Sequence, residues 1–314
     1  MANPTTSASP YTGLSRLKLF AALSRTPHGL IDMSTPMLGA LLWLGAFPSL
    51  RVILLGLLTV FAGYTAVYAL NDVVDYSTDR EKARMGLFGD PGGDLDAVLV
   101  RHPMAQGYLS FTEGLVWAVS WGAAALLGAY LLNPFCVLIF VGACALEVVY
   151  CLMLRVSYLR TVVSGAVKSA GTVAAVYAVD PNPSLGFVGL LFLWLVLWEI
   201  GGQNVPNDWT DADLDRRFGA RTVPVAFGSE TSIRIIAGCL LAAVILSIFL
   251  FAVSPAGFGG AYISMVVGIG VCLLLIPAFN LYRDPSTEKA MAVFNNASYY
   301  PLSLFGLVVI RLLL

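Results

Sequence analysis

The chain has little charge, few histidines and no paired cysteines, and each shortage excludes a class of protein. Charged residues make up 12% of the 314 residues and hydrophobic residues 58%, and the mean hydropathy is +0.80. A soluble domain carries about a quarter charged residues, so this composition predicts a polytopic membrane protein in a lipid bilayer. The formal net charge of −1 and the lack of a basic tail argue against a nucleic-acid partner.

The five cysteines lie in apolar runs without a Cys-x-x-Cys pair, which indicates small packing residues and not a metal site. His28 and His102 are too few and too far apart for a histidine metal site, although either suits an anionic ligand near a helix end. Residues 1–27 resemble no secretory signal and are expected to form a tail and a short interfacial segment. No obligate protein partner can be read from the sequence.

Long apolar runs, by contrast, recur along the whole chain. A bilayer core needs about 20 mainly apolar residues per helix. The sequence therefore predicts an all-α fold with nine transmembrane helices in a single domain over residues 1–314. The expected spans are 29–47, 50–70, 112–131, 135–154, 159–179, 185–204, 231–254, 259–281 and 291–313.

The connections between these spans alternate between short turns and long charged segments. Fifteen of the 18 lysines and arginines fall on the N-terminal side, whereas the opposite side keeps only Arg51 and Arg311, and Lys168 lies inside a span. By the positive-inside rule the charged side is cytoplasmic. We therefore expect a multi-pass protein of the cytoplasmic membrane, with its active site facing the cytoplasm and with residues 71–110 and 205–230 as cytoplasmic cap loops.

One polar pattern occurs twice, at the cytoplasmic ends of the second and sixth spans. The first motif consists of Asn71, Asp72, Asp75 and Asp79. The second motif has the same spacing 136 residues later, since 207 − 71 = 136, and consists of Asn207, Asp208, Asp211 and Asp215. This duplication predicts two pseudo-repeated four-helix units, spans one to four and five to eight, with the ninth helix added, around a central cavity.

The spacing within each motif predicts one acidic helix face, because positions i, i+3 and i+7 of a helix lie on the same side. Six carboxylates at a cavity mouth repel one another unless cations lie among them. Hard oxygen ligands suit Mg²⁺, which binds through a few carboxylates together with substrate phosphates. The sequence therefore predicts Mg²⁺ ions that bridge a diphosphate and are held by Asp72, Asp75, Asp79, Asp208, Asp211 and Asp215.

Two tyrosines precede the first motif on the same helical face. Tyr64 lies two turns and Tyr68 one turn before Asp72, so both rings are expected to line the cavity. Electron-rich rings at that place stabilise a carbocation. The alternative is that both tyrosines anchor the helix at the headgroup level.

Ionisable residues inside spans indicate function by default, because burying charge in a bilayer is costly. Lys168 and Glu199 are placed to face the central cavity. The alternative is that Asp32, Glu147 and Lys168 form structural pairs between helices. Among the basic residues near the motifs, Arg101 and Arg221 are the favoured phosphate contacts, with Arg25 as a further candidate.

These residues resemble the UbiA superfamily of intramembrane prenyltransferases. The likeness covers most of the chain and depends chiefly on the two aspartate motifs. Weaker companions occur in the same order: Arg25-Thr26-Pro27 before the first span, His102-Pro103-Met104-Ala105-Gln106-Gly107 after the first motif, and Gly219-Ala220-Arg221-Thr222-Val223-Pro224 with Gly228 after the second. The resemblance implies nine helices around a cavity open toward the bilayer, with both motifs binding Mg²⁺ and the prenyl diphosphate.

Two departures from the family pattern concern the loop after the first motif. The family usually has Arg-Pro where this chain has His102-Pro103, so either Arg101 serves from one position earlier or that contact is absent. The segment 85–99 is also longer and richer in glycine than is usual. The shape of the cap over the site is therefore left open.

The predicted activity is Mg²⁺-dependent transfer of a prenyl group from an allylic diphosphate to a small aromatic acceptor. An alternative is transfer to a non-aromatic acceptor such as a glycerol or sugar phosphate, because family members with the same motifs use both kinds. A metal-ion or solute transporter is the alternative of another class. The sequence argues against a transporter, because its carboxylates cluster at one mouth and not at bilayer depth.

Overall fold

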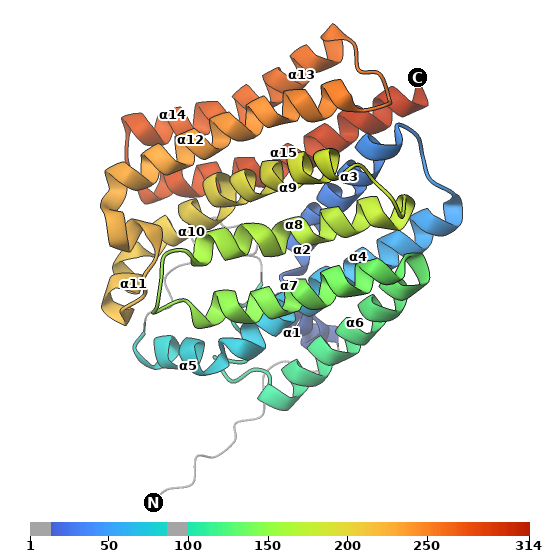
Figure 1. Ribbon diagram of the computed structural model, residues 1–314. Helices are drawn as coiled ribbons and strands as arrows, with labels where there is room; N and C mark the ends of the chain where they lie inside the picture. The colour runs from blue at the N-terminus through green and yellow to red at the C-terminus, as the bar shows by residue number, and fades with distance from the viewer. Residues whose placement is uncertain (1–13, 87–98) are drawn as a thin grey trace, which may run out of the picture.

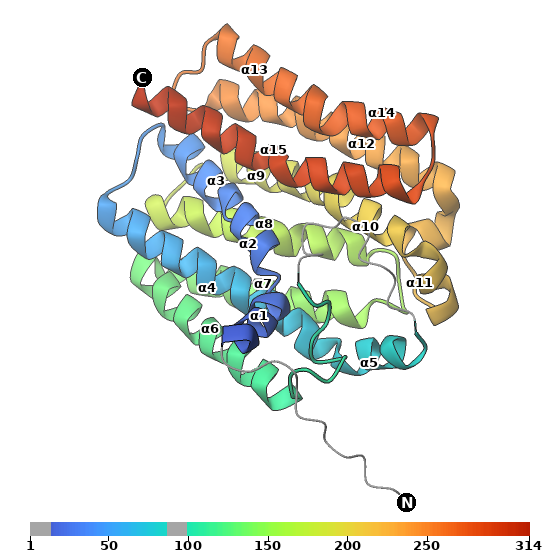
Figure 2. The same ribbon diagram turned by 180° about the vertical axis from the view of Figure 1, so that it is seen from behind.

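The computed structural model describes residues 14–86 and 99–314, and this part of the chain is built from helices. Figures 1 and 2 show long helices that run side by side, with α5 and α11 together at one end and the C-terminus at the other. Eight helical stretches are long and apolar enough to cross a membrane by length and composition. The all-helical class is confirmed, and the chain is an integral multi-pass membrane protein.

The first half of the chain begins with three short helices, α1 (Leu14–Leu23), α2 (Thr26–Asp32) and α3 (Ser34–Leu44). They are followed by α4 (Leu50–Val74), the short α5 (Tyr76–Arg84), α6 (Phe111–Leu132) and α7 (Pro134–Leu152). Side chains fix several of these boundaries. Ser110 and Glu113 form a capping box that starts α6, and the Asn133 side chain accepts a hydrogen bond from Phe135 N at the start of α7.

The second half contains α8 (Arg160–Val179) and α9 (Leu185–Trp198), and α9 continues through a π-helical segment η1 (Glu199–Asn204) into α10 (Val205–Thr210) and then α11 (Ala212–Phe218). The chain continues with α12 (Val223–Val253), α13 (Gly260–Gly270), a second π-helical segment η2 (Val271–Leu275), α14 (Ile276–Arg283) and α15 (Thr287–Leu313). Both π-helical segments precede a proline, Pro206 or Pro277. Because proline has no N–H to donate, the regular hydrogen-bond pattern fails there.

The expected first span, 29–47, is not one helix. Met33 separates α2 from α3. Pro36 cannot donate a backbone hydrogen bond to the Asp32 carbonyl one turn earlier, and the Thr35 hydroxyl donates to that carbonyl instead, at 3.0 Å. The prediction of a single long helix was therefore wrong at this place, although α2 and α3 cover most of the expected residues.

The largest core cluster lies in the second half, where α9, α12 and α15 pack together. Trp194, Trp198 and Tyr300 are its largest fully buried side chains, and Trp198 Nε1 donates to the Ala297 carbonyl at 2.9 Å. Many large apolar side chains on the outside, among them Leu58, Leu138 and Leu185, are exposed. An apolar exterior is the expected surface of a protein surrounded by lipid.

Candidate active site

A cavity of about 540 Å³ opens among the helices, and both aspartate motifs lie on its wall. Its lining includes residues from α4 and α8 and from the η1 and α10 segments. The structure therefore brings together thirteen of the fourteen residues that the sequence singled out. They are Arg25, Tyr64, Tyr68, Asn71, Asp72, Asp75, Asp79, Arg101, Lys168, Asn207, Asp208, Asp211 and Asp215.

Each motif spans a break between two helices and not one continuous helix face. α4 ends at Val74, and Asp75 lies between α4 and α5. Asp211 occupies the same place between α10 and α11. The prediction of one continuous helix was wrong, although all six carboxylates line the cavity, and the two breaks occur at equivalent positions. Asp and Asn side chains compete with the backbone for hydrogen bonds and so favour such breaks.

In the first motif, a histidine lies between two of the carboxylates. Nδ1 of His102 is 3.3 Å from Asp72 Oδ1 and 2.9 Å from Asp79 Oδ2. Burial alone would lower the pKa of His102, but the two carboxylates raise it to about 9. Burial would likewise raise the pKa of Asp79, but the His102 charge holds it below its ordinary value. A protonated imidazole thus occupies a place that attracts cations.

Asp75 is the third carboxylate of this motif, and it also lines the cavity. Burial raises its pKa, and the nearby charge of Asp79 raises it further. One ligand atom each from Asp72, Asp79 and His102 lies within 4.8 Å of the others, which is close enough for a shared metal ion. His102 could serve as a ligand only after it loses its proton, and Asp75 lines the cavity beside this group.

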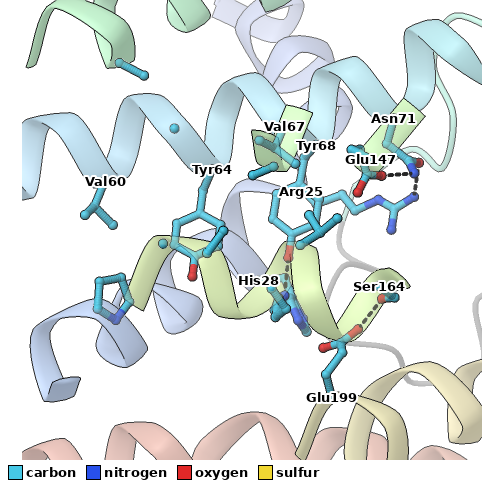
Figure 3. A pocket seen from close by; sticks show the side chains of 18 of the residues that line it. Arg25, His28, Val60, Tyr64, Val67, Tyr68, Asn71, Glu147, Ser164 and Glu199 are labelled. Atoms are coloured by element: carbon cyan, nitrogen blue, oxygen red, sulfur yellow. Dashed lines mark hydrogen bonds between the residues drawn. The ribbon is translucent and has the colours of Figure 1, made fainter. Parts of the chain in front are cut away.

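Asn71 joins the first motif to α7 and to the loop before α2. Its amide nitrogen donates to Glu147 Oε1 at 2.6 Å, and its oxygen accepts from Arg25 Nη2 at 3.4 Å (Figure 3). Arg25 also lies 3.8 Å from Asp72 Oδ1 and its guanidinium is 5.7 Å from the centre of the Tyr68 ring. Arg25 thus places a positive charge beside Asp72 and Asn71 of the first motif.

The second motif contains a buried carboxylate, Asp208, with one oxygen that has no hydrogen-bond partner among the described residues. Asp208 is 7% exposed, and this oxygen is its Oδ2. Its Oδ1 lies 3.5 Å from Nη1 of Arg160 at the start of α8. The Arg160 guanidinium is buried and lies 4.1 Å from the centre of the Tyr150 ring. This corner of the cavity joins a carboxylate and a fixed guanidinium.

Ionic contacts join the two motifs. Nζ of Lys82, on α5, lies 3.6 Å from Asp215 Oδ1 and 5.1 Å from the centre of the Phe218 ring on α11. Burial raises the pKa of Asp215, and Lys82 opposes that increase. The α5 and α11 segments also lie at the same end of the molecule in Figure 1. The first and second motifs therefore face one cavity.

Of the two favoured arginines, the structure brings only one to the site. Arg101 lines the cavity, and its carbonyl accepts a hydrogen bond from Gln106 Nε2 at 2.7 Å. Arg221 is exposed, does not line the cavity, and donates to the Val156 carbonyl at 3.3 Å. Arg221 instead fastens the segment after α11 to the α7–α8 connection. Asn207 lines the cavity, and its carbonyl accepts a bond from the Thr210 hydroxyl.

Farther along α4, both tyrosines line the cavity, as predicted. The Tyr64 hydroxyl lies 3.2 Å from Thr35 Oγ1. The Tyr68 hydroxyl donates to Asp32, and Lys168 Nζ contacts both Asp32 Oδ2, at 2.5 Å, and the Tyr68 hydroxyl, at 2.8 Å. The structural-pair alternative therefore holds for Asp32 and Lys168, while Lys168 also lines the cavity.

Sequence reasoning missed three site residues. His102 was considered for an anionic ligand and as a departure from a family pattern. Arg160 was counted only among the basic residues of the cytoplasmic side, and Lys82 only among the basic residues of that side near the first motif. An arginine at the start of an apolar span was the available signal for Arg160, since a buried guanidinium needs an anionic partner. His102 had no local signal, because its two partners lie 30 and 23 residues away.

Comparisons with known proteins show the family to which the chain belongs. Residues 33–300 match the model of the UbiA prenyltransferase family. The chain is 27% identical over 275 residues to a digeranylgeranylglyceryl phosphate synthase from Thermococcus sibiricus, covering 87% of this chain and 90% of that protein. It is 30% identical over 227 residues to a 4-hydroxybenzoate octaprenyltransferase from Pseudomonas fluorescens, covering 69% and 70% of the two chains.

A solved structure has the same fold. It is a UbiA homolog from Archaeoglobus fulgidus bound to DMAPP and Mg²⁺, with a TM-score of 0.67 at 17% identity, covering 94% of this chain and 99% of that one. The fold and the two facing carboxylate motifs define the class, a multi-pass membrane enzyme with an acidic cavity. The family match then identifies the chain more closely: it belongs to the UbiA prenyltransferase family.

Proposed function

We propose that this chain transfers a prenyl group from an allylic diphosphate to a small acceptor, with both aspartate motifs holding the diphosphate through Mg²⁺. The observation that carries the proposal is one cavity lined by both motifs and by the cations Arg25, Lys82 and Arg160. Carboxylates and cations on one wall suit a metal-bound diphosphate, because the carboxylates bind the metal ions and the cations bind the phosphate oxygens.

The residues present fit Mg²⁺. Carboxylate oxygens are the ligands that this ion prefers, and the unpartnered Oδ2 of Asp208 is available for coordination. Asp72 and Asp79 on one side, and Asp208 with Asp211 and Asp215 on the other, would hold the ions. Asp75 is the remaining motif carboxylate on the same wall. When bound, Mg²⁺ neutralises negative charge that grows on the departing diphosphate.

The protein's own cations support the same step. The bond between the allylic carbon and the diphosphate oxygen breaks, and the electron pair stays on that oxygen. Arg160 and Lys82 lie beside the second motif, and Arg25 beside the first, so their positive charges stabilise the diphosphate as it leaves. The Tyr64 and Tyr68 rings line the same cavity and would stabilise an allylic cation formed there. The acceptor then bonds to this carbon and loses a proton.

The relatives support two kinds of acceptor. One is named for a glyceryl phosphate product and the other for 4-hydroxybenzoate. A small aromatic acceptor is the first candidate, because two tyrosine rings line the wall of the cavity beyond the motifs. A glycerol or sugar phosphate is the second. Membership of a prenyltransferase family removes the transporter alternative.

The aspartate motifs can be tested by substitution. Asp72→Asn and Asp208→Asn should each lower prenyl transfer by about 1000-fold, because each change removes a carboxylate aimed at the diphosphate site. Transfer is measured with geranyl diphosphate and the membrane lipid extract of the host, and folding by gel filtration in detergent. Asp213→Asn is the matched control, because Asp213 is exposed and pairs with the exposed Arg216. Wild-type rates in both motif variants would contradict the proposal.

The proposed arrangement in the membrane has nine crossings in one domain, with α2 and α3 together making the first. It places both motifs in cap segments on the cytoplasmic side. The support is that α5, α11 and the α7–α8 connection, which carry many of the basic residues, lie at one end of the molecule (Figure 1).

This orientation predicts the labelling of two exposed positions. In intact cells, an impermeant maleimide should label Asn182→Cys, on the α8–α9 turn, and should label Asp213→Cys only after the membrane is opened. Both residues are exposed, so access depends on the side of the membrane alone. The background is a chain in which the five native cysteines are replaced by serine or alanine. The reverse labelling order would place the motifs outside the cell.

A further inference from the structure

Beyond the aspartate motifs, the cavity has a second polar region, here called the inner subsite. It consists of Tyr64 and Tyr68 on α4, Ser164 and Lys168 on α8, and Glu199 at the start of η1, and all five line the cavity. Figure 3 labels the two tyrosines, Ser164 and Glu199. Glu199 precedes Asp208 by nine residues along a nearly continuous helix, so the two lie roughly 13 Å apart along it. This separation leaves room for a second substrate beside the diphosphate.

The positive charge of the inner subsite is already neutralised. Lys168 Nζ contacts Asp32 Oδ2 and the Tyr68 hydroxyl, and Asp32 is 2% exposed. Asp32 Oδ1 also lies 3.7 Å from Nε2 of His28. If an anionic ligand drew Lys168 away, it would leave the Asp32 carboxylate buried without its nearest cation, which is costly. Lys168 is therefore a poor binding site for a carboxylate or a phosphate.

Glu199 provides the free polar atom of this region. Its side chain is 6% exposed, and its Oε1 accepts a hydrogen bond from the Ser164 hydroxyl at 2.8 Å. Its Oε2 is buried and has no hydrogen-bond partner among the described residues. An ionised carboxylate only accepts hydrogen bonds, and a buried one left unsatisfied is costly. A hydroxyl group in the cavity would satisfy this atom by donating to it.

The local fold fixes the position of Glu199. Gly201 and Gly202, in the same π-helical segment, pack closely on the neighbouring helices. A Cβ on Gly201 would lie 2.7 Å from Cys239 Cβ, and one on Gly202 would lie 2.7 Å from Ala297 Cβ. This close packing against α12 and α15 holds η1 in place while Glu199 stays on the cavity wall. Glu199 is therefore a preorganised acceptor and not a mobile surface group.

We propose that the inner subsite binds the acceptor of prenyl transfer, and that this acceptor is an uncharged hydroxyl compound whose O–H donates to Glu199 Oε2. This proposal rests on the function proposed above, because only a prenyl-transfer reaction gives the bound compound the role of acceptor. The nearest cation, Lys168, is already paired with Asp32, so the Glu199 carboxylate has no cation to share with an anionic acceptor and would disfavour one placed against it. A phenol or alcohol meets a hydrogen-bond acceptor beside the Tyr64 and Tyr68 rings.

The test compares two probes that differ in charge at one end. 4-Hydroxybenzyl alcohol and 4-hydroxybenzoate share a phenol, but only the second carries a carboxylate. Binding to the full chain in nanodiscs is followed by ligand-observed NMR titration. The wild-type protein should bind the alcohol at least tenfold more tightly than the benzoate. Equal binding, tighter binding of the benzoate, or no saturable binding of the alcohol would overturn the proposal.

Substitution of Glu199 gives a readout that a purely structural role would not produce. Glu199→Gln removes the negative charge at nearly constant volume, so it should strengthen 4-hydroxybenzoate binding at least threefold and weaken binding of the alcohol. Ser164→Ala removes the bond that orients the carboxylate, so it should weaken alcohol binding without strengthening benzoate binding. Glu230→Gln is the control, because Glu230 is exposed and pairs with Arg234. If Glu199→Gln leaves both affinities unchanged, Glu199 does not contact the ligand.

The same titrations run without diphosphate separate this proposal from the proposed function. Binding of geranyl diphosphate with Mg²⁺ is measured in parallel on the wild type and on Glu199→Gln. Failure of the wild type to bind geranyl diphosphate would contradict the proposed function, while the probe affinities would still test the inner subsite. Normal diphosphate binding with no preference for the uncharged probe would contradict the inner subsite alone.

Discussion

Arg160 illustrates how single residues acquire a role from distant partners. It begins α8, is 6% exposed, and lies between Asp208 Oδ1 and the Tyr150 ring. Its Nε atom has no hydrogen-bond partner in the described part of the chain. The Arg160 guanidinium has a free donor, and the neighbouring Asp208 carboxylate has a free acceptor. Together they suit a metal-bound diphosphate, because its oxygens accept hydrogen bonds and its metal ions bind carboxylates.

Removal of this guanidinium should weaken diphosphate binding. Arg160→Ala should raise the KM for the prenyl diphosphate by about 10- to 100-fold, because charge-assisted hydrogen bonds contribute about 1.5–3 kcal/mol. Arg160→Lys should recover part of this loss, since lysine keeps the charge but lacks the planar fork. Steady-state kinetics with varied geranyl diphosphate measures the effect. Arg234→Ala, at an exposed arginine, serves as control, and an unchanged KM in Arg160→Ala would exclude the contact.

At the scale of elements, breaks in helices place the functional side chains. Asp75 and Asp211 interrupt equivalent helices, and η1 replaces regular α-helix just before Pro206. In the first half, α4 stays α-helical through the equivalent region. The two repeats therefore have the same spacing within the motif but differ in the helix segment that precedes it. The extra backbone width of η1 lets two glycines pack against α12 and α15 while Glu199 faces the cavity.

The π-helical segment should be sensitive to added volume. Gly201→Ala places a Cβ 2.7 Å from Cys239 Cβ and 3.0 Å from the Ile236 carbonyl oxygen, so neighbouring helices must move apart. Overpacking of this kind costs about 1–3 kcal/mol. Thermal unfolding in detergent should begin several degrees lower than in the wild type. Gly189→Ala is the matched control, since nothing lies within 4 Å of its added Cβ. Equal unfolding temperatures would show that η1 accommodates the added methyl group without loss of stability.

At the scale of the whole molecule, the two halves meet through charges at one end. Lys82 on α5 contacts Asp215, and Arg155, which follows α7, contacts Glu81 at 3.0 Å and lies 3.9 Å from the centre of the Phe218 ring on α11. The remaining motif carboxylates repel one another across the same cavity, and burial raises the pKa of both Asp75 and Asp215. A ligand that neutralises both motifs should therefore stabilise the association of the two halves.

Mg²⁺ and a prenyl diphosphate should stabilise the fold only when they act together. At ligand concentrations about 100 times the dissociation constant, the gain is about 2.7 kcal/mol, which corresponds to an increase in Tm of several degrees. Scanning fluorimetry with a non-reactive geranyl thiodiphosphate measures the increase, and EDTA should reverse it. Asp72→Asn and Asp208→Asn should each reduce it. A full increase with either variant would mean that one motif alone binds the ligand.

The sequence by itself determined the membrane class, most span positions and the two motifs, because hydropathy and residue spacing are local properties of the chain. Only the tertiary structure decided which charges meet. His102 joins Asp72 and Asp79, Arg160 joins Asp208, and Lys168 is committed to Asp32, while Arg221 faces away from the cavity. These pairs depend on how helices far apart in sequence pack, and on proline-induced breaks that turn side chains, so no local spacing encodes them.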